Sequence, residues 1–367
     1  MGYPCTVFEA LPVAGGMLAV GIPEYRLPDD ILKYEIDYIE KTGVEIKTGK
    51  KLGKDFTIDD LINDGYDAVF LAVGSHKAFE LEIEGADHPA VIPGVKFLSE
   101  INLKNEFEIG ERVAVIGGGN VAIDSARSAL RIGSKEVFIV YRRSLEQMPA
   151  LPEELEQLEE EGIEIKFLAA PKRILADGNK LKGLECMRME LGEPDSSGRR
   201  RPVPIEGSEF VLDCDNVIVA IGQTSELNFI SNEGLKASSR GILEVDPETD
   251  LSNRQGVFAG GDMVTGPLNV VTAIFHGKLA AKGIHQYLSG KKVEREYSPI
   301  QPAEHVDVTE LTDEEMEKLA RPKGSRKPGR ERIKSLVEVE ECISEQQAVL
   351  EAKRCLRCDM EIQIEMK

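Results

Sequence analysis

The sequence predicts an α/β protein with two Rossmann-like domains, each a doubly wound parallel sheet covered by helices. Three observations lead to this prediction. An apolar, β-branched run from Val113 to Ile116 is followed by a glycine-rich turn and then by apolar residues at helical spacing. Two further apolar runs read as buried strands that stop at a glycine, Gly74 in one and Gly222 in the other. One such strand in each half indicates two dinucleotide-binding folds in one chain.

The glycine-rich turn runs from Gly117 to Ala122 with the spacing G-x-G-x-x-A. In a strand–turn–helix unit the first glycine allows a tight turn, and the second lets the backbone approach a pyrophosphate. The helix N-terminus then offers free N–H groups to the phosphates. Such turns often only join a strand to a helix, but here both flanking elements stand in the required order. We therefore predict that Gly117, Gly119, Asn120 and Val121 bind a dinucleotide.

The strand that follows, Val137 to Val140, ends at Tyr141, Arg142 and Arg143. A site for NAD would carry an acidic residue here to hold the ribose 2′-hydroxyl, whereas two guanidinium groups suit a 2′-phosphate. A solvated arginine pair at a strand end is the alternative. The substitution favours NADPH as the nucleotide.

The N-terminal segment from Thr6 to Glu9 reads as a strand that ends in an acidic residue. The second strand of a dinucleotide fold ends in this way, and its carboxylate accepts hydrogen bonds from adenosine ribose hydroxyls. An edge strand with a surface glutamate explains these residues equally well. The strand, turn and helix that should precede Glu9 are missing from the sequence, so we interpret this part as a truncated nucleotide-binding half.

A loop rich in Gly and Pro follows over residues 11–28, where Gly15 and Gly16 would let the backbone pass close to a flat ring system. Much later, a short strand from Gly256 delivers Asp262 at its tip, and a helix begins after Gly266. An aspartate there can hold a polyol hydroxyl, and the helix N-terminus stabilises negative charge on a reduced ring. Read in isolation, Asp262 is equally a turn residue.

The intervening segments carry less information. We expect an amphipathic helix over residues 31–39, a loop-rich region up to Leu103 and a helix over residues 153–161. Residues 192–204 should form a turn and loop, which we interpret as a solvated hairpin end.

Composition excludes several classes of protein. The 367 residues carry 45 basic and 65 acidic side chains, a net charge of −20, which argues against nucleic-acid and anionic-membrane partners. Apolar runs are too short to span a membrane and no secretory leader is recognisable, so we predict a cytoplasmic protein. Six cysteines in a chain of this length do not form a secreted disulfide framework.

The composition changes after Lys291. Residues 321–332 form a basic linker rich in Pro and Gly, for which a solvated linker is the preferred interpretation and docking of an acidic partner the alternative. Ser344 and Gln347 are spaced as a capping box that starts a helix. That helix carries Cys355 and Cys358, which, with Cys342, supply three of the four ligands that an iron–sulfur cluster needs. A cluster or zinc site shared with another chain, a redox dithiol and inert thiols all remain open.

Several of these stretches together resemble the small subunit of NADPH-dependent glutamate synthase and related FAD- and NADPH-binding reductases with two dinucleotide folds. The matching stretches are residues 7–10, 15–18, 21–28, 117–127, 141–143, 260–262 and 271–274, and the tail over residues 352–359 also looks like that of some relatives.

The resemblance implies a split FAD domain over residues 1–104 and 226–290, with the NADPH domain, residues 105–225, inserted between them and a linker and helical tail over residues 291–367. It implies that Glu9 holds the FAD adenosine ribose and Asp262 the ribitol, while residues 15–18 line the flavin. The family's FAD glycine motif and its iron–sulfur domain are absent from this sequence. We therefore expect either a fragment of a longer gene product or a site completed by another chain.

The cofactor-binding residues that we predict, from the patterns and from the resemblance, are Glu9, Gly15, Gly16, Met17, Leu18, Arg26, Gly74, Gly117, Gly119, Asn120, Val121, Arg142, Arg143, Gly222, Gly261, Asp262, Val271 and Thr272. Hydride transfer from a nicotinamide to a flavin requires orientation and exclusion of water, so we predict no catalytic acid, base or nucleophile. We expect electrons to pass from FAD to an iron–sulfur centre, a partner subunit or a ferredoxin-like protein. The competing prediction is a non-catalytic NADPH-binding or scaffolding subunit that no longer holds FAD.

Overall fold

The computed structural model describes residues 1–105, 107–195, 198–239, 241–291, 312, 314, 322 and 324–353. They belong to two compact units, one of Met1–Val293 with Gly329–Val337 and one of Glu294–Pro328 with Glu338–Lys367. The candidate metal ligands Cys355 and Cys358 lie outside the described residues. Within the described part of the chain, every helix is too short or too polar to cross a lipid bilayer.

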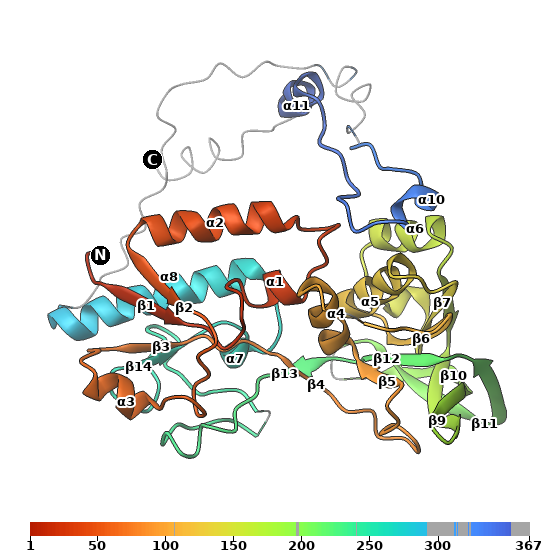
Figure 1. Cartoon of the computed structure of the whole chain (residues 1–367), viewed down its shortest axis with the longest axis horizontal. Helices are drawn as coiled ribbons and strands as arrows, with labels where there is room; N and C mark the ends of the chain where they lie inside the picture. The colour runs from red at the N-terminus through yellow and green to blue at the C-terminus, as the bar shows by residue number, and fades with distance from the viewer. Residues whose placement is uncertain are drawn as a thin grey trace. The chain divides into compact units, whose positions relative to one another are not determined.

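A five-stranded parallel sheet forms the centre of the NADPH half that the sequence predicts (Figure 1). Its strands, in spatial order, are β5 (Val91–Pro93), β12 (Asn216–Ala220), β6 (Arg112–Gly117), β7 (Glu136–Tyr141) and β8 (Glu164–Phe167). Helix α5 (Asn120–Arg131) connects β6 to β7. The predicted strand–turn–helix–strand unit is therefore confirmed.

The two faces of this sheet are covered by different layers. Successive side chains of a strand point to opposite faces, so Val113 and Val115 of β6 pack with α4 (Gly94–Asn102), α5 and α6 (Pro152–Glu160). Ala114 and Ile116 instead pack in a second cluster with an antiparallel sheet formed by β11 (Arg200–Asp213), β10 (Lys180–Pro194) and β9 (Ala169–Asp177). All four of these side chains are buried, which explains the nearly continuous apolar run in the sequence.

Two expectations for this half are partly right. The region up to Leu103 is loop-rich only to residue 90, because β5 and α4 occupy residues 91–102 and supply buried Ile92 and Phe97 to the core. Residues 192–204 lie at a hairpin end, as expected, but strand extends to Pro194 on one side and begins again at Arg200 on the other.

The FAD half that the sequence predicts contains two separate two-stranded parallel sheets. One pairs β1 (Cys5–Phe8) with β2 (Val44–Lys47), and the other pairs β14 (Val257–Ala259) with β3 (Val69–Leu71). Residues 229–263 return after the second half and share one buried cluster with Ile58, Val69 and Leu71. This return confirms the predicted split arrangement, in which one fold is inserted into another.

The remaining helices of this half are α1 (Met17–Val20), α2 (Asp29–Lys41), α3 (Ile58–Asn63), α7 (Asp262–Thr265) and α8 (Val270–Ser289). The chain crosses between the halves through two short strands, β4 (Lys77–Ala78) and β13 (Gln223–Thr224), which pair antiparallel. A 3-10 helix, η1 (Leu145–Gln147), follows β7.

The C-terminal part contributes to both units. Helix α10 (Gly329–Arg332) belongs to the first unit, where Arg332 is buried, so the predicted solvated linker is wrong at this residue. The physical reason is that Arg332 pairs with Glu160 of α6 and with Glu161, which directly follows that helix. In the second unit, α11 (Glu345–Ala352) starts at Ser344, and the reciprocal bonds between Ser344 and Gln347 confirm the predicted capping box.

Candidate nucleotide-binding sites

The N-terminus of α5 lies at the carboxyl edge of the five-stranded sheet. Gly117 has φ 146°, and a Cβ there would lie 2.2 Å from the Ala220 carbonyl oxygen, so only glycine fits this turn. Gly119 is the N-cap and has no side-chain cap. A Cβ at Gly119 would meet no other atom within 4 Å. An uncapped helix end with open space before it is a suitable site for a pyrophosphate, next to Asn120 and Val121.

The two arginines after β7 have different surroundings. Arg142 is exposed. Arg143 is buried, and its Nη2 lies 2.8 Å from Asp195 Oδ2 while its Nε donates to the Arg200 carbonyl oxygen. Arg143 therefore attaches the strand end to the β10–β11 hairpin. Of the two predicted guanidinium groups, that of Arg142 is the one that extends into solvent.

The loop after β1 contains the first group of residues predicted to meet FAD. Glu9 follows β1 directly, and its carboxylate accepts a hydrogen bond of 2.7 Å from the Leu11 backbone N–H. Gly15 and Gly16 both have positive φ, and Gly16 is the N-cap of the short helix α1, which begins with Met17 and Leu18. A Cβ at Gly16 would meet nothing within 4 Å, so the backbone is open to close approach there.

The second predicted FAD segment surrounds Gly261. Its φ is 68°, and Asp262 follows it, with Oδ1 accepting a hydrogen bond of 3.3 Å from the Leu268 N–H. Asn269 caps α8 by accepting from the Thr272 N–H, and Val271 in the first turn is 78% exposed. An exposed apolar first turn beside an aspartate suits a ligand with an apolar ring and a polyol arm.

His76 is a candidate site residue that the sequence analysis missed. It lies two residues after Gly74, and its Nε2 is 3.3 Å from the position that a Gly74 Cβ would occupy. Burial lowers the pKa of His76, and the nearby carboxylates of Glu9, Asp262 and Glu226 oppose this shift. Glu9 and Asp262, from opposite ends of the split half, thus both act electrostatically on this imidazole. The position of His76 just beyond a strand-ending glycine was the available signal.

Gly222, the strand-ending glycine of the other half, lies at the crossing between the halves. Its carbonyl oxygen accepts from the Phe79 N–H at 3.0 Å, and a Cβ at Gly222 would lie 2.8 Å from the Phe79 ring. Close approach between the two crossing strands therefore requires a glycine at this position.

Arg26, predicted as a cofactor-binding residue, forms ion pairs with Asp124 and Glu154 on the helices of the other half. The described residues contain no group of three or more His, Cys, Asp or Glu side chains suited to a metal ion. Cys342 is exposed, while burial raises the pKa of both Cys186 and Cys214 to about 12, so these two thiols stay protonated.

Comparison with known proteins supports the same architecture. The model of the pyridine nucleotide-disulphide oxidoreductase family matches residues 9–277. The structure of Mycobacterium tuberculosis FprA in complex with NADPH is similar with a TM-score of 0.65 at 21% identity, covering 78% of both chains. Thioredoxin reductase of T. acidophilum gives a TM-score of 0.57 at 20% identity over 79% of this chain and 91% of that one. These likenesses confirm the predicted fold class.

Two curated relatives are similar at the level of sequence. The NADP(+)-dependent formate dehydrogenase subunit beta of Moorella thermoacetica is 46% identical over 97% of this chain and 51% of its own length. The glutamate synthase [NADPH] small chain of Escherichia coli is 36% identical over 78% of this chain and 64% of its own length. The chain thus spans between about half and two thirds of the length of these relatives, and the predicted resemblance is confirmed.

Proposed function

Because the chain belongs to the pyridine nucleotide-disulphide oxidoreductase family, we propose that it is an NADPH-dependent flavin oxidoreductase. It binds NADPH in the second half and FAD in the split first half, so that hydride passes from the nicotinamide to the flavin. Curated relatives are named as NADP- or NADPH-dependent enzymes, which supports this assignment.

The observation that carries the proposal is the uncapped N-terminus of α5 at the edge of a parallel sheet. Gly117 makes the turn, the space before Gly119 admits a pyrophosphate, and the helix dipole favours its charge. Exposed Arg142 recognises the 2′-phosphate, while Arg143 holds the strand end in place through Asp195. These side chains distinguish NADPH from NADH.

The first half fits FAD by the same criteria. Gly16 leaves the backbone open, and Val271 offers an exposed apolar surface in the first turn of α8. Asp262 accepts a hydrogen bond from the Leu268 N–H just before this helix. Glu9 holds the adenosine ribose and Asp262 the ribitol, with Thr272 in the first turn of α8. When bound, FAD accepts a hydride and releases its electrons one at a time. The protein's residues bind, orient and exclude water; none has to donate or accept the transferred hydride.

The electron acceptor is a partner subunit, a ferredoxin-like protein or an iron–sulfur centre. Relatives named as beta subunits of a formate dehydrogenase and of an NADPH-Fe(3+) oxidoreductase support a role within a larger assembly. The cytoplasmic location remains a prediction from the sequence.

The experiment is an anaerobic absorbance spectrum of the purified chain with added FAD, followed by an NADPH-dependent dye-reduction assay. A retained flavin band together with dye reduction that prefers NADPH to NADH supports the proposal. A protein that binds NADPH but stays colourless after FAD is added is instead the non-catalytic scaffolding subunit.

A further inference from the structure

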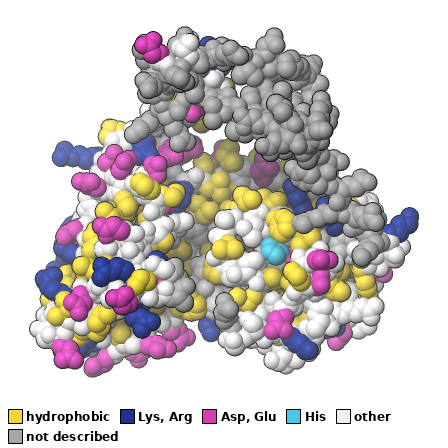
Figure 2. Space-filling view, turned by 180° about the vertical axis from the view of Figure 1, so that it is seen from behind, with side chains coloured by type: hydrophobic (Ala, Val, Ile, Leu, Met, Phe, Trp, Pro, Cys, Tyr) yellow, Lys and Arg dark blue, Asp and Glu magenta, His cyan; other side chains and the backbone are white. Residues whose placement is uncertain are grey.

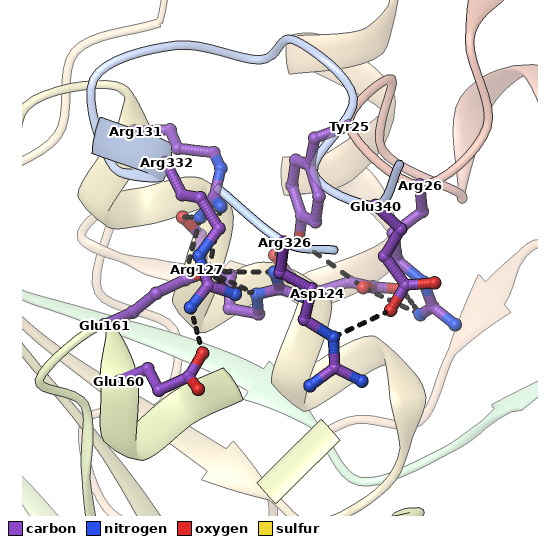
Figure 3. Close-up of polar contacts among 10 residues, drawn as sticks. All are labelled: Tyr25, Arg26, Asp124, Arg127, Arg131, Glu160, Glu161, Arg326, Arg332 and Glu340. Atoms are coloured by element: carbon purple, nitrogen blue, oxygen red, sulfur yellow. Dashed lines mark hydrogen bonds and ion pairs between the residues drawn. The ribbon is translucent and has the colours of Figure 1, made fainter. Parts of the chain in front are cut away.

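The loop over residues 21–28 contacts the middle of α5 in the structure (Figure 3), and its Arg26, predicted to bind a cofactor, takes part in this contact. Tyr25 is 1% exposed, and its ring lies against two guanidinium groups. The ring centroid is 4.7 Å from Cζ of Arg127 and 4.1 Å from Cζ of Arg131. Its hydroxyl donates to Asp124 Oδ1 at 3.4 Å. A loop of the FAD half is therefore inserted against the helix whose N-terminus is proposed to bind NADPH.

Arg26 extends this contact to a second helix. Its Nη1 donates to both carboxylate oxygens of Asp124 at 2.8 Å, and its Nη2 lies 3.2 Å from Glu154 Oε1 on α6. The side chain of Asp124 is almost wholly buried and a third of that of Arg26 is exposed, so water screens this ion pair less than a fully exposed one. One arginine of the first half thus attaches two helices of the second half.

Beneath this contact lies a network of ion pairs around buried Glu161. Glu161 accepts hydrogen bonds from Arg127 and Arg131, and its Oε1 lies 3.6 Å from Arg332 Nη1 of α10. Arg332 also pairs with Glu160. The guanidinium groups beneath Tyr25 are therefore fixed by a carboxylate on the opposite side from the ring, and the tyrosine ring meets a rigid surface (Figure 3).

The halves are also joined at other places. At the crossing, Lys77 and Ala78 pair with Thr224 and Gln223, and the hydroxyls of Ser75 and Ser225 lie 3.1 Å apart. Near the loop over residues 21–28, Asn102 at the end of α4 donates to the Ile22 carbonyl oxygen at 2.9 Å. A pair of two-residue strands is a narrow connection about which two domains can rotate. A second attachment away from the crossing restricts such rotation, and the Tyr25–Arg26 contact is one.

We propose that Tyr25 and Arg26 are positioning residues that fix the orientation of the NADPH half relative to the FAD half. Hydride transfer requires the reacting atoms to be held close and aligned, so a residue that sets the angle between the halves sets the transfer rate without touching either cofactor. The consequence for turnover rests on the proposed function, whereas the orientation itself can be measured without any cofactor.

The direct test is a distance distribution between two spin labels, carried on non-canonical amino acids at exposed Lys41 on α2 and exposed Lys182 on β10. We expect one narrow distribution for the otherwise unchanged full chain and a clearly broader or shifted one for Arg26→Ala. The matched control is Lys33→Ala, which removes the exposed Lys33–Asp37 pair within α2 and should leave the distribution unchanged. An unchanged distribution in Arg26→Ala overturns the proposal.

Because Arg26→Ala leaves Asp124 buried and unpaired, a second variant separates positioning from folding. Arg26→Gln with Asp124→Asn removes both charges and leaves groups that can still hydrogen-bond. We expect its melting temperature to exceed that of Arg26→Ala while its distance distribution remains broad. A narrow distribution in this neutral double variant would contradict positioning by the ion pair.

The kinetic consequence is tested on the FAD-loaded chain by single-turnover flavin reduction. In both Arg26 variants we expect the rate at saturating NADPH to fall at least tenfold, while the NADPH concentration for half-maximal rate changes less than twofold. Wild-type reduction rates combined with a broad distance distribution would contradict the link to turnover. A wild-type chain that is never reduced would instead overturn the proposed function and leave the distance measurement standing.

Discussion

The two halves of the first unit are built on related plans but have different degrees of internal support. In the second half, nine of the twelve residues of α5 are buried, and the parallel sheet has five strands. In the first half, all thirteen residues of α2 are described and none is buried, and the strands form two separate pairs. Parallel sheets are normally covered on both faces and contain more strands than this.

The apolar surface shows the same contrast. Many exposed hydrophobic side chains of the first half lie on α2 and on the first turns of α8, among them Ile31, Tyr34, Tyr38, Ile39, Val270, Val271, Ile274 and Phe275. Figure 2 shows hydrophobic side chains reaching the surface among charged ones on the face it displays. Both halves have a buried core, but we expect the first half to gain further stability when bound FAD covers part of this exposed surface.

The largest effect that we expect comes from the buried charges of the second half. Glu161→Ala removes the carboxylate that Arg127 and Arg131 share, leaving two buried guanidinium groups without it. Breaking a buried ion pair typically costs about 3–5 kcal/mol. Chemical unfolding followed by circular dichroism should show this loss. Glu164→Ala, which removes an exposed ion pair with Lys166, is the control and should change stability by less than about 1 kcal/mol.

The same carboxylate gives the second half an acid-sensitive stability. Burial opposes ionisation of Glu161, but hydrogen bonds from Arg131 and Arg127 outweigh it and hold its pKa below the usual range. Its contribution is therefore present above the unfolded pKa of about 4.3 and is lost as the pH falls through the lower folded pKa. The difference in unfolding free energy between wild type and Glu161→Gln should be constant from pH 7 down to about 4.3 and should shrink as the pH falls further below that value. A difference that stays constant below about pH 4 would exclude this source.

The glycine turn gives the next effect. Gly117→Ala places a Cβ against the Ala220 carbonyl at a positive φ, and we expect a loss of about 3 kcal/mol or more from strain and overlap. Gly119→Ala enters open space at φ −100°, so its stability should stay near wild type while NADPH affinity falls. Thermal melts and NADPH titrations of both variants separate the two roles. Equal destabilisation by Gly117→Ala and Gly119→Ala would contradict these separate roles of the two glycines.

FAD and NADP⁺ should protect different halves of the first unit. FAD at about 100 times its dissociation constant should stabilise the folded state by about 2.7 kcal/mol. Hydrogen exchange should then slow chiefly in α2 and in the first turns of α8, whose exposed side chains mark the first half. NADP⁺ should instead slow exchange at the N-terminus of α5. Protection by FAD confined to the second half would reverse the assignment of the two sites.

The smallest effect concerns nucleotide choice. Arg142→Ala should weaken NADPH binding about tenfold, or about 1.4 kcal/mol, because one guanidinium–phosphate contact is lost, and leave NADH binding unchanged. The matched control is Arg112→Ala, which removes a different arginine of the second half, one that pairs with Asp213 at the surface. A parallel loss of NADH affinity would show that Arg142 does not read the 2′-phosphate.

The sequence predicted elements whose signals are local. The run from Val113, the turn at Gly117 and the helix after it follow from residues adjacent in the chain. The sequence analysis missed β11 because Pro202 and Pro204 argue against a strand, yet β11 lies at the edge of its sheet, where proline is tolerated. Arg26 was predicted to bind a cofactor, and its pairing with Asp124 joins residues 98 positions apart, which periodicity does not reveal.

The central claim is that this chain brings NADPH and FAD together for hydride transfer. The most direct measurement is an anaerobic titration of the FAD-loaded chain with NADPH, followed by flavin absorbance. We expect the flavin band to bleach in proportion to added NADPH, with an end point at one equivalent per bound flavin. A band that remains unchanged with NADPH bound in the second half would contradict the claim.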